Sequence, residues 1–67
     1  MGMLTIKEIQ ALAKVAGVEV IADRWHGAGW EAYVSRWPTI LLVGTLADTK
    51  RKAMNNAWGE YVEKANL

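Results

Sequence analysis

Apolar residues recur at helical spacing near the start of the chain, between a start signal and a stop signal. Thr5 and Glu8 form a capping box, in which each side chain accepts a hydrogen bond from the other residue's backbone amide. Gly17 follows as the residue type that adopts a positive φ without strain. The pattern therefore predicts a helix over residues 5–16. Its apolar positions are Ile6, Ile9, Leu12, Ala13 and Ala16.

The next part of the chain has the composition of a β-hairpin. Residues 18–21 are mostly β-branched, and residues 30–37 are rich in aromatic and β-branched types. Between them, His26-Gly27-Ala28-Gly29 is a strong turn signal. We therefore expect strands near 18–25 and 30–37, paired around this turn. The alternative for residues 30–37 is a helix that Pro38 ends.

A third strand and a second helix complete the pattern. Pro38 marks another reversal, and the apolar run 40–43 predicts a short strand that ends before Gly44. Asp48 or Thr49 can cap the helix that follows. Its broad apolar stripe comprises Ala53, Met54, Ala57, Trp58, Tyr61, Val62 and Ala65.

This order of elements predicts an α+β fold, a helix–three strands–helix domain. A three-stranded antiparallel sheet would carry two helices packed on one face, because each helix has an apolar stripe to bury. Residues 1–67 are expected to form a single domain. Residues 1–3 are expected to be disordered, or to include an addition ahead of a natural start at Met3.

Composition excludes several classes of site. The chain has no cysteine and one histidine, so a disulfide, a thiolate zinc site and a two-histidine metal site within the chain are excluded. We expect neither a metal nor a small-molecule cofactor. The longest aliphatic run, residues 40–43, is far shorter than a membrane-spanning helix. The expected protein is therefore soluble and cytoplasmic, with no membrane partner.

The sequence favours a binding module over an enzyme. Ser35 is the only serine, and the lone His26 lies at a predicted turn, so no triad pattern exists. The segment 27–29 lacks the rest of a dinucleotide-binding signature. A catalytic site needs several positioned groups and a closed pocket, and we expect no catalytic residues.

Three consecutive cations open the second predicted helix. Lys50-Arg51-Lys52 stands where unpaired backbone amides and the helix dipole are already positive, a placement that costs stability and is typical of a functional site. Cations beside free amides suit phosphate groups. The alternative is a solvated charge run partly neutralised by Asp48. The candidate nucleic-acid-binding residues are Lys50, Arg51, Lys52, Asn55 and Gln10.

The order of elements and the segment Lys50-Arg51-Lys52-Ala53, followed by Ala57, resemble the double-stranded RNA-binding domain. That family opens its second helix with Lys-Lys-x-Ala-Lys and a pair of alanines. The resemblance implies that the three cations contact phosphates of an RNA or DNA duplex. It also implies that Glu8 and Gln10 on the first helix reach a minor groove. Met54 and Trp58 depart from the family's pattern.

Four tryptophans are a large aromatic share for so short a chain. Trp58 belongs to the apolar stripe and is expected in the core. In an alternating strand Trp30 and Trp37 point to opposite faces, and helices cover only one face. At least one of these tryptophans is therefore expected on the open face of the sheet. If that residue is Trp37, Tyr33 lies on the same face. Exposed aromatic side chains mark interfaces. The candidate protein-interface residues are Trp25, Trp30, Tyr33 and Trp37.

Two functional hypotheses follow. The first is binding of a nucleic-acid backbone by the basic start of the second helix. The second is a protein-interaction or inhibitor module, a homodimer included, that uses the Trp/Tyr sheet face. The net charge of +1 favours the second, because bulk attraction to nucleic acid needs a more basic domain. The cations at the wrong end of the helix favour the first.

Overall fold

The computed structural model describes residues 3–24 and 27–65. The elements follow in the order α1 (Ile6–Ala16), β1 (Glu19–Arg24), β2 (Trp30–Arg36), β3 (Thr39–Ala47) and α2 (Lys50–Ala65). The strands form one antiparallel sheet in the order β1-β2-β3. The predicted α+β fold is confirmed, and β2 decides the open alternative at residues 30–37 in favour of a strand.

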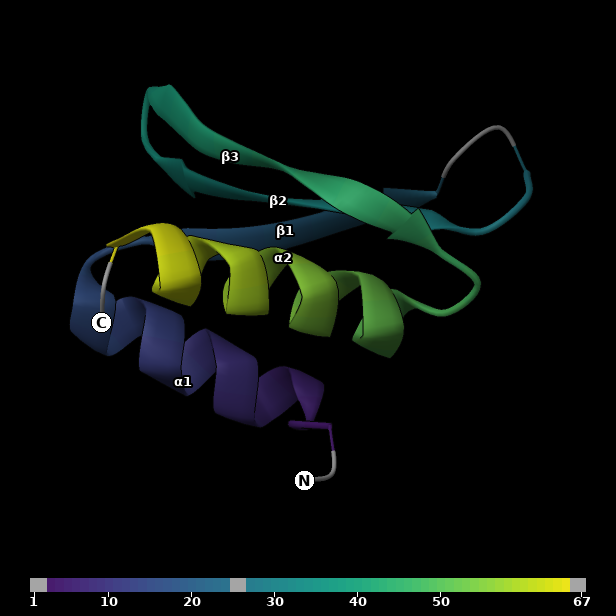
Figure 1. Ribbon diagram of the computed structural model, residues 1–67, viewed down its shortest axis with the longest axis horizontal. Coiled ribbons are helices and arrows are strands. Elements are labelled where there is room, and N and C mark those ends of the chain that lie inside the picture. The colour runs from purple at the N-terminus through teal and green to yellow at the C-terminus, as the bar shows by residue number, and fades with distance from the viewer. Residues whose placement is uncertain (1–2, 25–26, 66–67) are drawn as a thin grey trace.

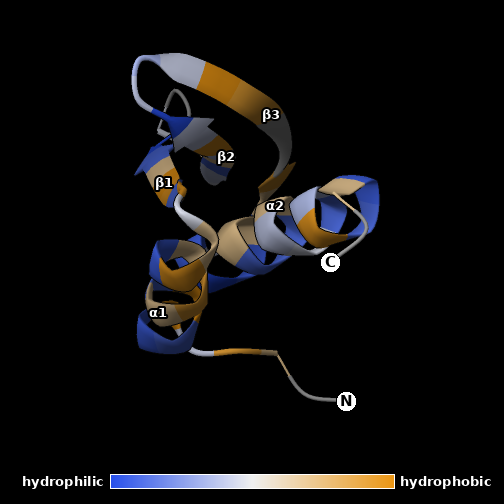
Figure 2. Ribbon diagram, turned by 90° about the vertical axis from the view of Figure 1, so that its left-hand side faces the viewer, coloured by the Kyte–Doolittle hydropathy of each residue, from blue (hydrophilic) through white to orange (hydrophobic). Residues whose placement is uncertain are grey.

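Both helices lie on the same side of the sheet, as expected (Figure 1). Helix α2 packs across all three strands, whereas α1 packs against α2 and β1. The view turned by 90° shows α1 beneath β1, with the start of β3 rising away from both helices (Figure 2). Within the described part of the chain, neither helix is long and apolar enough to cross a membrane.

The two ends of α1 form as their sequence signals predict. The Glu8 amide donates to the Thr5 hydroxyl at 3.1 Å, and the Thr5 amide donates to the Glu8 carboxylate at 2.8 Å. The hydrogen bond from the Thr5 amide, then that from its hydroxyl, lowers the pKa of Glu8. Gly17 ends the helix at a φ of 76°, the left-handed conformation in which a side chain would be strained.

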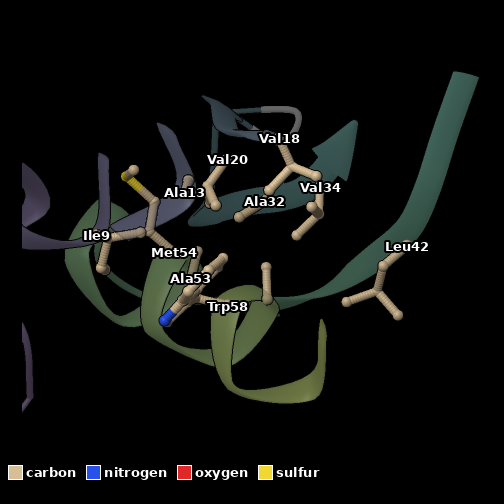
Figure 3. Close-up of a cluster of buried hydrophobic side chains, with 11 residues drawn as sticks. Ile9, Ala13, Val18, Val20, Ala32, Val34, Leu42, Ala53, Met54 and Trp58 are labelled. Carbon is tan, nitrogen blue, oxygen red and sulfur yellow. The ribbon is translucent and has the colours of Figure 1, made fainter. Parts of the chain in front are cut away.

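Small residues let α2 approach the sheet closely. Ala53 and Ala57 lie four residues apart on one face of α2, and both are fully buried, as is Ala32 of β2. Larger side chains fill the space around these alanines. Met54 is buried against Ile9 of α1, where its flexible side chain suits the irregular gap between two helices (Figure 3). The other core residues are Ala13, Val18, Val20, Val34, Leu42 and Trp58.

Most residues of the two predicted apolar stripes are buried or half-buried, as expected. Trp58 is 8% exposed and stacks on Tyr61, so the prediction that it belongs to the core is confirmed. Leu12 departs from the pattern, because it is 44% exposed on α1. It lies one residue before the buried Ala13, on the flank of the helix that neither β1 nor α2 covers. Ala65, at the end of α2, is exposed as well.

The third strand is longer than the sequence predicts. It was expected over residues 40–43, ending before Gly44, but β3 runs from Thr39 to Ala47. The pairing with β2 shifts at two places, and at each β3 contains one more residue than β2 opposite it. These bulges absorb the extra residues, so β3 continues past Gly44 to Ala47.

Candidate functional site

The three cations at the start of α2 point in different directions. Consecutive residues of a helix are turned by about 100°, so three in a row cannot share a face. Lys52 forms an ion pair with Asp48 at 3.2 Å. The ammonium of Lys50 lies 5.8 Å from the centre of the Trp30 ring. Lys50 and Lys52 therefore make separate contacts, and Thr49 caps the helix through the amide of Lys52.

Arg51 and Asn55 hold the N-terminal segment against α2. Arg51 donates to the carbonyl oxygens of Met3 and Leu4, at 2.7 and 2.9 Å. The Asn55 amide group donates to the Leu4 carbonyl and accepts from the Leu4 N–H, at 3.0 and 2.9 Å. Both side chains were candidate nucleic-acid contacts, and the structure gives both a role within the fold. Residues 1–2 lie outside the described residues, whereas Met3 takes part in this contact.

Lys50 meets a cation that the sequence analysis did not include. The guanidinium of Arg24, at the end of β1, lies 5.4 Å from the centre of the same Trp30 ring. Arg24 and Trp30 are partners in the β1–β2 register, and Lys50 begins α2 beside them. Two cations from separate elements thus converge on one indole, where the ring face attracts positive charge. We call Arg24, Trp30 and Lys50 the basic edge.

The hairpin expected from the sequence does not identify Arg24 as the partner of Trp30, because a turn at 26–29 is flanked by residues 25 and 30. In the structure β1 ends at Arg24 and β2 begins at Trp30, so the register pairs these two residues. Trp25 and His26 lie outside the described residues.

A hollow joins the basic edge to α1. It has a volume of about 260 Å³ and is bounded by Gln10 of α1, residues 19–22 of β1, and Lys50 and Met54 of α2. Two candidate nucleic-acid-binding residues, Gln10 and Lys50, therefore line one surface. Glu8 is used differently, because its carboxylate caps α1 and keeps a negative charge there. Of the two residues that the resemblance implies on the first helix, Gln10 is the one beside the basic edge.

The open face of the sheet is apolar and acidic. Strand alternation places Tyr33 there, between Ile21 of β1 and Val43 of β3 in the register. Ile40 and Leu46 add exposed apolar surface from β3, at 58% and 53% exposure. The charged residues that alternation puts on this face are Glu19, Asp23 and Glu31. The three carboxylates therefore make this face repel phosphate.

Trp30 and Trp37 differ in their surroundings, but Trp37 lies in a turn past the end of β2 and not on a strand face, where it was expected. Trp30 is half-buried on the helix-covered face with Ala32 and Val34. Trp37 is 88% exposed in the turn between β2 and β3, just past the end of β2. Tyr33 is half-buried on the open face. The aromatic surface of the sheet is thus made by Tyr33 and, at its end, by Trp37.

Among residues 3–24 and 27–65, no group of three histidine or carboxylate side chains is placed to hold a metal ion.

The described residues form two surfaces of different chemistry, the basic edge and the open sheet face. Comparison with known proteins adds no relative, since no family model, no curated protein and no solved structure matches the chain.

Proposed function

We propose that the protein binds the phosphate backbone of a nucleic-acid duplex through the basic edge. The observation that carries the proposal is the convergence of Arg24 and Lys50 on Trp30. In the described part of the chain, Lys52 forms an ion pair with Asp48, and neither cation of the basic edge pairs with a carboxylate. Two cations beside one ring, neither of them paired with a carboxylate among the described residues, form a surface that an anion stabilises.

The start of α2 adds to this attraction. Lys50 is the first residue of a 16-residue helix, where unpaired backbone N–H groups and the dipole favour negative charge. Gln10 extends the surface along the hollow on the β1 side and can donate to a sugar or phosphate oxygen. The contact contains few cations, so we expect weak binding with little dependence on base sequence. This footprint is compatible with the resemblance to the double-stranded RNA-binding domain.

The test is the affinity for a labelled RNA duplex and a DNA duplex of the same sequence, measured by fluorescence anisotropy over a range of salt. Each phosphate contact contributes about −0.9 to the slope of log affinity against log salt. The double variant Arg24→Gln, Lys50→Gln should flatten the slope by roughly 2 and weaken binding at low salt more than tenfold.

The matched control is Lys64→Gln, which removes one charge near the opposite end of α2. It should change the affinity by less than the single variant Lys50→Gln does. Equal losses in Lys50→Gln and Lys64→Gln would show that only net charge matters, and the basic edge would then not be the site. Absence of binding to both duplexes at low salt would also reject the proposal.

A second candidate function is protein–protein interaction through the open sheet face. The observation that favours it is the uncovered apolar surface of Tyr33, Ile40 and Leu46, which continues to Trp37. Exposed apolar surface on a small domain is typical of an interface. This surface is separate from the basic edge, so each function can be tested without disturbing the other.

A further inference from the structure

The most exposed aromatic side chain in the described part of the chain is Trp37, in the turn between β2 and β3. Two apolar neighbours on β3 are also exposed, Ile40 at 58% and Leu41 at 40%. This end of the hairpin rises away from both helices and includes a hydrophobic stretch of β3 (Figure 2). Together the three side chains expose on the order of 400 Å² of apolar surface, a patch of the size that marks interaction sites.

A hollow lies directly beside this tryptophan. Its volume is about 260 Å³, and its walls come from the end of α1, the start of β1 and the end of β2. The lining residues are Lys14, Gly17, Val18, Glu19, Ser35, Arg36 and Trp37 itself. Pockets for drug-sized molecules measure roughly 300–1,000 Å³, so a single inserted side chain suits this hollow better than a ligand does.

We infer that the occupant is Trp37 of a second copy of this chain. A two-fold axis beside Trp37 brings the two indoles together and sets each one over the hollow of the other copy. The contact is then isologous, since each copy gives one tryptophan and receives one. Ile40 and Leu41 carry no charge, so they can meet their counterparts at the rim without repulsion. This inference rests on the second candidate function.

The chemistry of the hollow fits an indole ring. Lys14 and Arg36 supply two cations, and a cation is attracted to the face of tryptophan more than to any other aromatic ring. Arg36 is held in place, because its Nε donates to the carbonyl oxygen of Gly17 at 3.3 Å. Val18 offers an apolar wall, and the two indoles can stack on each other at the axis.

Side-chain packing, and not a continuous sheet, should join the two copies. The free edge of β3 is interrupted by its two bulges, one of which includes Leu41. Bulges of this kind prevent long ladders between edge strands. Because each copy offers on the order of 400 Å² of apolar surface here, the buried area stays below the roughly 1,200 Å² of stable complexes. We therefore expect a reversible dimer that forms at micromolar to millimolar concentration.

Sedimentation equilibrium of the full chain over that concentration range tests the inference. The wild type should dimerise, and Trp37→Ser should remain a monomer. Lys14→Gln should weaken the dimer roughly two- to fivefold by removing one cation from the ring. Two controls should leave the dimer intact: Val15→Ser, at an α1 position that is 89% exposed, and Lys7→Gln, which removes a cation that does not line the hollow.

Salt separates this contact from nucleic-acid binding. Lys14 and Arg36 line the hollow, so two copies bring like charges together. Raising the salt should leave the dimer unchanged or strengthen it, whereas it weakens a phosphate contact. A dimer that survives Trp37→Ser would overturn the inference and leave protein interaction through the open face in place. A wild-type monomer at millimolar concentration would overturn the inference, without bearing on the basic edge.

Discussion

Asn55 shows how strongly the role of one residue depends on a distant part of the chain. Its side chain satisfies both backbone groups of Leu4 and also donates to the Arg51 carbonyl at 2.8 Å. From the sequence, Asn55 is a polar residue outside an apolar stripe, which suits a ligand contact equally well. Leu4 lies 51 residues away, and no local pattern indicates that pairing. The same reason explains Arg51, whose partners are equally remote.

Replacing Asn55 by alanine should destabilise the fold. The change leaves the half-buried N–H of Leu4 without a partner, while the Leu4 carbonyl keeps its hydrogen bond from Arg51, so the cost is about 1–3 kcal/mol. The matched control is Asn56→Ala, one residue along and exposed, which should stay within about 0.5 kcal/mol of the wild type. Urea unfolding measures both.

Duplex affinity of the folded protein separates the two roles of Asn55. It should not change in Asn55→Ala if the side chain serves the fold alone. A loss of affinity with unchanged stability would instead return Asn55 to the binding site.

At the scale of elements, local sequence signals predict the ends of a helix well, whereas the length of a strand depends on pairing with its neighbour and is predicted less well. Helix α1 forms as expected because its cap and stop depend on neighbours within a few residues. The predicted length of β3 was wrong because the extent of this strand depends on its pairing with β2. Glycine illustrates the difference, since Gly17 ends a helix through its own φ whereas Gly44 lies within a paired strand.

Two glycine-to-alanine changes should have opposite effects. Gly29 precedes β2 at a φ of 83°, and a Cβ atom there would lie 2.8 Å from the carbonyl oxygen of Ala47. Gly29→Ala should therefore destabilise by about 1–3 kcal/mol, because backbone must move and the conformation is strained. Gly59→Ala, with nothing within 4 Å in α2, should stabilise by about 0.5–1 kcal/mol. Thermal unfolding followed by circular dichroism measures both, and equal shifts would contradict the close approach of Gly29 to β3.

At the scale of the molecule, a net charge of +1 conceals a strong asymmetry. Three carboxylates lie on the open face of the sheet: Glu19, Asp23 and Glu31. The chain has eight cations and seven carboxylates, so the rest of the molecule holds eight cations and four carboxylates, a balance of +4. Composition alone reports the sum, and the register of the sheet is needed to separate the parts. This separation is what allows a basic edge in a nearly neutral chain.

The acidic face also carries a conflict that neutralisation should relieve. Asp23 and Glu31 are directly opposite each other across β1 and β2, and like charges so placed destabilise a sheet. Glu31→Gln should raise the free energy of unfolding by about 0.2–1 kcal/mol at neutral pH and low salt. Glu19→Gln is the matched control on the same face. Because Glu19 is opposite the uncharged Ser35, this change should raise the free energy of unfolding by less than Glu31→Gln does.

The gain from Glu31→Gln should disappear below about pH 3, where both carboxyl groups are protonated and the repulsion is absent in either protein. Urea unfolding at neutral and acid pH, at low salt, measures this dependence. An equal gain in the two variants, or a gain that persists in acid, would mean that the opposed pair is not its cause. A confirmed gain would mean that the sequence keeps a destabilising charge pair on its uncovered face, as expected where a surface is shaped by a partner more than by stability.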